Sequence, residues 1–126
     1  MANRITSLCI DATDPRLLAD FWCQVLDWQV TEEDSEVVRI QDGPDARLAI
    51  DFCWVPDGPK TVKNRLHLDL NATDRDQATE LERLLALGAR PTDIGQGPDV
   101  SWVVLADPED NEFCLLRSRV EPWSPR

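Results

Sequence analysis

Residues 11–14 read Asp-Ala-Thr-Asp, and residues 71–74, sixty positions later, read Asn-Ala-Thr-Asp. A second echo follows in the same order, because Asp51-Phe-Cys-Trp-Val55 returns as Glu112-Phe-Cys-Leu-Leu116, 61 positions on. Self-similarity at one period is typical of a chain built from repeated structural units. The sequence of 126 residues therefore predicts two copies of one module.

Each half begins with an alternation of apolar and polar residues, at 4–11 and again at 64–70. A period of two is typical of a strand with one buried face. Three further strands are predicted in each half after a helix, and turns rich in Gly, Pro and Asp separate them. Their predicted bounds are 28–33, 36–41 and 47–55 in the first half, and 90–94, 100–106 and 112–117 in the second.

Apolar residues at helical spacing follow the first strand of each half. The first helix is predicted to begin with Asp14 as its N-cap and Pro15 at its first position. The second helix is predicted to begin after Asp74 as its N-cap and to end at Gly88.

The predicted element order is therefore βαβββ twice, which is an α+β fold. We expect a single domain over residues 1–126, with module 1 at about 1–56, module 2 at about 61–118 and a tail at 119–126. One helix covers only one face of each curved mixed sheet. The opposite faces are predicted to form a concave cup that binds a ligand.

Composition limits the partners. The chain has 13 Lys+Arg against 24 Asp+Glu, a net charge of −11, with 42% hydrophobic and 29% charged residues. These fractions exclude wholesale disorder, and the negative charge repels nucleic acid and anionic membranes. We expect a small-molecule ligand, neutral or cationic. No apolar run is long enough to span a membrane and no signal-like segment is visible, so a cytoplasmic protein with reduced cysteines is predicted.

Three motifs carry a resemblance to a known family: Asp14-Pro-x-x-Leu-Ala-x-Phe-Trp22, Lys63-Asn-Arg-Leu-His-Leu-Asp69 and Asp107-Pro-Glu-Asp-Asn-Glu-Phe-Cys114. Together with the paired modules, they resemble the glyoxalase-like branch of the glyoxalase/bleomycin-resistance/dioxygenase, or vicinal oxygen chelate, superfamily. The resemblance implies small-molecule binding in the cup, a homodimer, and lyase or isomerase chemistry next to a carbonyl. Ordinary glyoxalase I activity is not expected. The alternative is a metal-free drug-binding protein of the bleomycin-resistance type.

The resemblance also implies four positions for a divalent metal, which here are Ser7, Cys53, His67 and Cys114. Only His67 keeps a ligand type that is usual in the family. Two thiolates and an imidazole suit zinc or a softer ion better than Mg²⁺ or Mn²⁺. The competing interpretation, which we favour, has no metal: the cysteines pack as small apolar side chains and the histidine is hydrogen-bonded.

His67 is the only histidine, and its expected position on a polar sheet face suits a general base near neutral pH. Asp69, two residues further along the same face, is predicted to orient the imidazole. The alternative is an ordinary salt-bridged row that also includes Arg65. The predicted ligand-binding side chains are Arg65 for an anionic group, Trp102 as a stacking wall, and Glu112 as a further oxygen donor.

Overall fold

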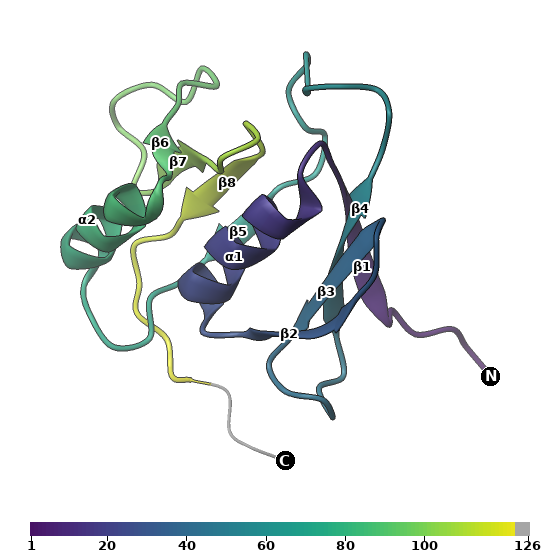
Figure 1. The fold of residues 1–126 in the computed structure, drawn as a ribbon. Coiled ribbons are helices and arrows are strands. Elements are labelled where there is room, and N and C mark those ends of the chain that lie inside the picture. Colours follow the sequence, from purple (N-terminus) through teal and green to yellow (C-terminus); the bar gives the residue numbers. More distant parts are fainter. Residues whose placement is uncertain (123–126) are drawn as a thin grey trace. The chain divides into compact units, whose positions relative to one another are not determined.

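The computed structural model describes residues 1–122, and the last four residues of the predicted tail, including Trp123, lie outside the described part. The chain divides into two compact units, Met1–Pro59 (unit 1) and Lys60–Arg126 (unit 2). Each unit has a four-stranded mixed sheet and one long helix (Figure 1). The predicted α+β fold with two βαβββ modules is confirmed. The predicted cup lies between the modules. It depends on how the two units are placed relative to each other, so it stays a prediction.

Unit 1 contains β1 (Ser7–Ala12), α1 (Pro15–Leu26), β2 (Gln29–Glu33), β3 (Val37–Gln41) and β4 (Ala49–Trp54). The strand order is β1-β4-β3-β2. The first and last strands pair in parallel, and the other neighbours are antiparallel. This crossover connection requires the intervening helix, which covers one face of the sheet.

Unit 2 repeats this arrangement with β5 (Leu68–Leu70), α2 (Gln77–Leu87), β6 (Arg90–Pro91), β7 (Val103–Ala106) and β8 (Glu112–Leu115) in the order β5-β8-β7-β6. Its strands are shorter than predicted. The backbone N–H of Asn64 donates to the Glu112 side chain, not to a strand ladder, so β5 begins only at Leu68. Pro91 has no N–H to donate, and β6 ends there.

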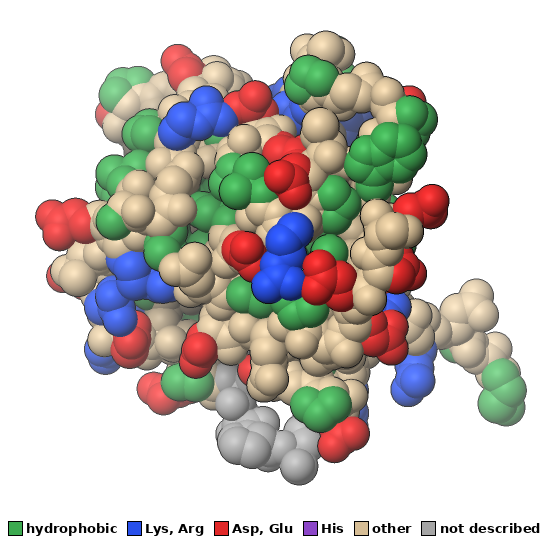
Figure 2. Space-filling view, in the orientation of Figure 1, with side chains coloured by type: hydrophobic (Ala, Val, Ile, Leu, Met, Phe, Trp, Pro, Cys, Tyr) green, Lys and Arg blue, Asp and Glu red, His purple; other side chains and the backbone are tan. Residues whose placement is uncertain are grey.

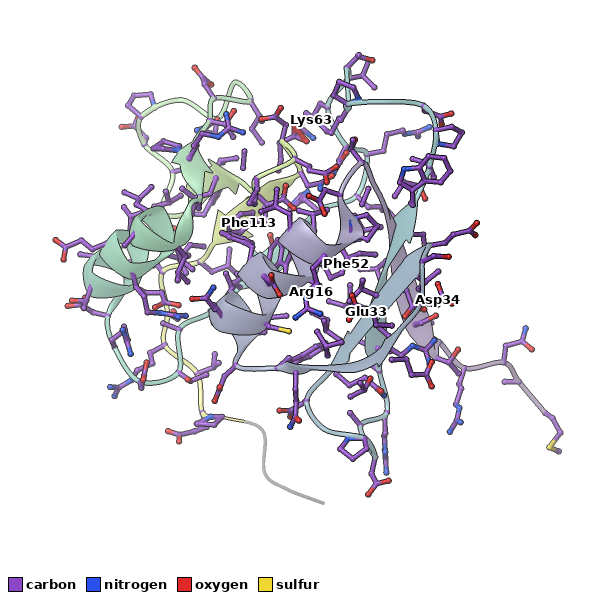
Figure 3. The ribbon with its side chains drawn as sticks, viewed as in Figure 1. Arg16, Glu33, Asp34, Phe52, Lys63 and Phe113 are labelled. Carbon is purple, nitrogen blue, oxygen red and sulfur yellow. The ribbon has the colours of Figure 1, made fainter. Side chains whose placement is uncertain are left out.

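The helix-facing sides of both sheets form the apolar cores. In unit 1, α1 contacts all four strands, and Leu18, Trp22 and Phe52 are fully or almost fully buried (Figure 3). In unit 2, Leu84 of α2 and Phe113 of β8 are buried. Each such side chain contributes about 1.5–3 kcal/mol by leaving water. The predicted alternation between one apolar and one polar face is confirmed in β1, where Ile10 is less exposed than Cys9 and Asp11.

The surface carries the acidic excess in scattered groups, and Figure 2 shows acidic side chains spread over the face in view with basic ones between them. On unit 1, Arg16 of α1 donates to Asp20 at 2.9 Å and to Glu33 of β2 at 2.7 Å (Figure 3). These side chains are about half exposed, so the pairs contribute little to stability. In the described residues, no helix combines the length and apolar character needed to cross a membrane.

The turn between the last two strands has the conformation that its sequence demands. Asp107 is fully buried, and its Oδ1 accepts hydrogen bonds from the backbone N–H groups of Glu109 and Asn111, both at 2.9 Å. Asp110 has φ 69°, a region that Asp tolerates better than most residues. The turn therefore depends on the tolerance of Asp110 for positive φ.

One helix start is as predicted and the other is not. Asp14 caps α1, because its Oδ1 accepts from the N–H of Leu17 at 3.1 Å. The prediction of Asp74 as the cap of α2 is wrong: Asp76 accepts from the N–H of Thr79 at 2.8 Å. Residues 71–74 stay outside the helix because they lie beside the stretch after β8. The Ala72 carbonyl accepts a hydrogen bond from the N–H of Val120 in that stretch.

Replacing the observed cap of α2 should lower the stability of the protein more than replacing the predicted cap. We expect Asp76→Ala to lower the free energy of unfolding of the protein by about 1 kcal/mol, because it leaves an N–H of the first helical turn without its partner. Asp74→Ala removes only an exposed pair with Arg75 and should change stability by less than about 0.5 kcal/mol. Urea unfolding followed by circular dichroism measures both, and an equal or larger loss in Asp74→Ala would contradict the assignment.

Candidate functional site

Three side chains of the polar face of unit 2 come together. Asp69 of β5 pairs directly with Cys114 of β8, and His67 Nε2 lies 3.2 Å from Asp69 Oδ1. One ligand atom of each of the three residues lies within 4.8 Å of the others. The His67 and Asp69 side chains are 41% and 50% exposed, whereas Cys114 is 5% exposed. The structure thus brings three sequence-predicted site residues into one cluster.

The thiol of this cluster is held in its neutral form. Burial raises the pKa of Cys114, and the neighbouring Asp69 carboxylate raises it further by charge repulsion and by accepting a hydrogen bond. The predicted contact between Asp69 and the imidazole is present, although same-face neighbours on a strand lie about 7 Å apart. Side-chain orientation closes that gap.

The polar face of unit 1 carries a second group of thiols and carboxylates. Cys9 of β1 pairs with Asp51 of β4, and Asp11 pairs with Cys53. Burial, together with the neighbouring Cys9 thiol, raises the pKa of Cys53 to about 12. Arg39 of β3 holds Asp51 in a bidentate pair, with N–O distances of 2.7 and 2.9 Å. Sequence reasoning gave Cys9 no role.

The strand register matches residues of unit 1 to residues of unit 2 differently from the sequence echo. The carbonyl of Ala12 accepts from the N–H of Val55 in unit 1, and that of Leu70 accepts from the N–H of Leu116 in unit 2. Val55 and Leu116 are 61 positions apart, as in the echo, but Ala12 and Leu70 are only 58 apart. The structural counterpart of His67 is therefore the residue 58 positions before it, Cys9.

By the same register, Asp11 corresponds to Asp69, and Cys53 still corresponds to Cys114. Ser7, which the echo matched to His67, is level with Ala49 on β4, whereas Cys53 is level with Asp11. Four residues of strand separate these levels, or roughly 13 Å. The structure does not bring Ser7 and Cys53 close enough together to bind one ion.

Two other predicted ligand-binding residues lie outside the cluster of unit 2. Arg65 is exposed in the segment before β5, and Trp102, before β7, is 40% exposed. In the described part of the chain, neither makes a hydrogen bond or ion pair with His67 or Asp69. Their predicted roles depend on a ligand and stay predictions.

Glu112, the third predicted ligand-binding residue, is already engaged. Lys60 Nζ donates to its Oε2 at 2.7 Å, and the backbone N–H of Asn64 donates to its Oε1 at 2.8 Å. Burial alone would raise the pKa of this carboxyl, but the hydrogen bonds from Lys60 and Asn64 outweigh it, and the pKa lies below its ordinary value. Glu112 therefore ties the first residues of unit 2 to β8.

A family model described as a glyoxalase-like domain matches residues 7–116. The chain belongs to the glyoxalase-like family. No curated protein matches the sequence. The match spans both units of the domain and confirms the resemblance to the glyoxalase/bleomycin-resistance/dioxygenase superfamily.

Solved structures share the fold of this glyoxalase-like domain at low sequence identity. The fosfomycin resistance protein FosX from Listeria monocytogenes, solved as a point mutant with Mn(II) and a dihydroxypropylphosphonic acid, has a TM-score of 0.71 and 14% identity over 95% of this chain and 93% of its own. A glyoxalase/bleomycin resistance protein/dioxygenase family enzyme from Burkholderia phytofirmans has a TM-score of 0.67 and 19% identity, over 87% of this chain and 94% of its own. The oxidase ChaP-H2 has a TM-score of 0.64 and 15% identity, over 96% of this chain and 98% of its own. At these identities the likeness concerns the fold alone.

The donor atoms of the unit 2 cluster decide which metal ion suits this glyoxalase-like domain. Imidazole nitrogen, carboxylate oxygen and thiolate sulfur are the three ligand types of protein zinc sites. Mg²⁺ and Mn²⁺ prefer oxygen donors, and Cys114 is a poor substitute for one. The residues His67, Asp69 and Cys114 fit zinc, with a fourth position left for water or substrate.

Lys60 and Lys63 offer a matched pair for testing the anchor on Glu112. Lys60→Met should lower the free energy of unfolding by about 1.5–3 kcal/mol, because it leaves a largely buried carboxylate without its charged partner. Lys63 donates only to the exposed carbonyl of Asn64, so Lys63→Met should change stability by less than about 0.5 kcal/mol. Urea unfolding at pH 7 measures both variants.

The same anchor has a defined pH dependence. Because the folded pKa of Glu112 is lowered, its stabilisation is present above the unfolded pKa, about 4.3, and is lost as the pH falls through the folded value. The difference between Lys60→Met and the natural protein should therefore shrink in acid. A difference that stays constant below that range would contradict an ion-pair origin.

Proposed function

We propose that this glyoxalase-like domain binds a small carbonyl compound and acts as a lyase or isomerase at the carbon next to the carbonyl, with His67 as the base. The observation that supports the proposal is the 3.2 Å contact between His67 Nε2 and Asp69 Oδ1 beside Cys114. An imidazole oriented by a carboxylate is a recurrent general base. The fold is also that of structures named as an oxidase and as a fosfomycin resistance protein.

The position of Asp69 selects the nitrogen that reacts. With its Oδ1 3.2 Å from Nε2, the Asp69 carboxylate favours the tautomer that carries the proton on Nε2, and the lone pair of the neutral imidazole is then on Nδ1. Nδ1 removes a proton from the carbon next to the carbonyl, and the electron pair left behind is delocalised onto the carbonyl oxygen. Return of the proton to a neighbouring atom gives isomerisation, whereas departure of a leaving group gives lysis. The Asp69 carboxylate stabilises the imidazolium formed in between.

A zinc ion held by His67, Asp69 and Cys114 would supply Lewis-acid polarisation of the carbonyl oxygen. The imidazole lone pair serves either as base or as ligand. The proposal assigns it to proton transfer, so His67 acts as the base in the metal-free protein. A homodimer and a cytoplasmic location complete the proposal and follow from the family resemblance and the composition.

Proton abstraction is measured directly by exchange. In D₂O, the protein should catalyse deuterium incorporation next to the carbonyl in at least one member of a panel of small 2-oxo and 2-hydroxy carbonyl compounds, followed by proton NMR. His67→Ala should lower that exchange rate by about 100-fold or more, because it removes the base. Asp69→Asn should lower it less, while Asp45→Asn, at an exposed position in the other unit, should not change it.

Metal content decides between the two roles of the imidazole. Protein prepared without a polyhistidine tag should retain its exchange activity after dialysis against a chelator. Activity that is lost on dialysis and restored by zinc would make His67 a ligand and refute its assignment as base. Wild-type exchange in a folded His67→Ala variant would refute the proposal altogether.

A second candidate, metal-free binding of a drug-like molecule, is favoured by the exposure of Trp102. A tryptophan that is 40% exposed presents a ring face for stacking, and the net charge of −11 favours a cationic ligand. Trp54 at the end of β4 is a second exposed tryptophan, at 49%.

The two exposed tryptophans provide a test and its control. A cationic aromatic compound that binds by stacking on Trp102 should quench the intrinsic fluorescence of the protein in a saturable way. Trp102→Phe should abolish the saturable quenching, whereas Trp54→Phe should preserve it at the same midpoint. Equal quenching in all three proteins would exclude Trp102 as the stacking side chain.

A further inference from the structure

The sequence motif that contains His67 and the motif that contains Cys114 are joined by a hydrogen bond. Asn64 of the first motif donates from its Nδ2 to Oδ1 of Asn111 in the second, at 3.0 Å. We propose that Asn64 is a positioning residue, which holds the imidazole of His67 beside Asp69. The chemical meaning of this role rests on the proposed function, because His67 is the proposed base.

The chain at His67 is held neither by the strand ladder nor by burial. β5 begins only at Leu68, one residue later. Arg65, Leu66 and His67 are exposed, and Leu66 is 80% exposed. Among the described residues, the backbone groups of these three residues have no hydrogen-bond partner. The position of the imidazole therefore depends on the points at which the chain is fixed on either side.

Both fixed points attach the chain to the same stretch of unit 2. On one side of the histidine, Leu68 pairs with Phe113 of β8. On the other side, the backbone N–H of Asn64 donates to Oε1 of Glu112 at 2.8 Å, and its side chain donates to Asn111. The three partners are consecutive residues at the start of β8. The segment with the histidine is thus fixed at both ends, which restricts the conformations of its backbone.

The orientation of the Asn111 amide is decided by Asp107. Asp107 is fully buried, and its Oδ1 and Oδ2 accept from Nδ2 of Asn111 at 3.2 and 3.0 Å. Carboxylate oxygens accept hydrogen bonds and an amide nitrogen donates them, so Nδ2 faces Asp107 and Oδ1 is left for Asn64. Position 64 therefore needs a side chain that donates.

Asn64→Asp tests this requirement with a side chain of nearly the same size. The substitution replaces the donor by a carboxylate oxygen, which faces a second acceptor, Oδ1 of Asn111. Two acceptors repel each other, so the segment should detach from the turn. His67 should then be beside Asp69 for a smaller part of the time.

Asn71→Asp is the matched control. It makes the same change of charge a few residues after His67, whereas Asn64→Asp makes it a few residues before. It also removes an amide donor, because Asn71 Nδ2 donates to the carbonyl of Ser118 at 2.7 Å. That bond holds the stretch after β8 and not the segment before β5.

The tautomer of the imidazole reports the contact directly. The protein has one histidine, so nitrogen NMR of isotope-labelled, tag-free protein shows one pair of imidazole signals. At about pH 8.5, above the ordinary histidine pKa of about 6.5, and with a chelator present, the imidazole is neutral and free of metal. We expect the Nε2–H tautomer to predominate in the natural protein, because Asp69 Oδ1 lies 3.2 Å from Nε2.

The two variants should differ in this measurement. Asn64→Asp should lower the ratio of the Nε2–H to the Nδ1–H tautomer by roughly 2- to 10-fold, the range that one hydrogen bond of ordinary net strength supports. Asn71→Asp should leave the ratio as it is in the natural protein. An unchanged ratio in folded Asn64→Asp would overturn the proposal, and so would an equal change in Asn71→Asp.

A second variant keeps the test decisive if Asn64→Asp does not fold, as judged by circular dichroism. Asn64→Ala removes the donor without adding charge and should change the ratio in the same direction, whereas an unchanged ratio would again overturn the proposal. The exchange assay remains separate, because a natural protein without exchange activity would refute the proposed function and leave the tautomer result standing. Where exchange occurs, Asn64→Asp should lower kcat and leave KM nearly unchanged.

Discussion

The parallel pairing of the first and last strand in each unit is the constraint on which the rest of the structure depends. This pairing, β1 with β4 and β5 with β8, forces the chain to cross over the sheet, and the crossover contains the helix. The helix buries one face of the sheet and leaves the other polar. The register of the same pairing then decides which polar side chains are neighbours.

Two clusters of related chemistry result from this arrangement. In unit 2 an imidazole, a carboxylate and a thiol lie together, and in unit 1 two thiols lie beside a carboxylate. Each thiol of the last strand has a raised pKa because burial and negative neighbours disfavour its charged form. A bound cation or ligand favours the charged form of the thiol instead. Corresponding positions of the two units therefore carry different donor atoms.

Much of the fold was predictable because it depends on local chemistry. Apolar periodicity identified the strands and helices, and Asp14 before Pro15 marked the start of α1. The contact between His67 and Asp69 was predictable as a shared face, since residues two apart on a strand point the same way. The cap of α2 was not, because the contact of Ala72 with Val120 extends the loop past Asp74.

The sequence by itself determined the duplicated βαβββ order, the polar and apolar face of each strand, and the candidate residues His67, Asp69, Cys53 and Cys114. The element order and the faces follow from periodicity, which is a property of the chain alone, whereas the metal positions Cys53 and Cys114 are what the resemblance to the family implies. Only the tertiary structure decided which positions of neighbouring strands are level with each other. A period of two specifies a face but no height along the strand, so the partnership of Cys9 with Cys53, and the distance of Ser7 from it, became visible only once the hydrogen bonds between β1 and β4 were in place.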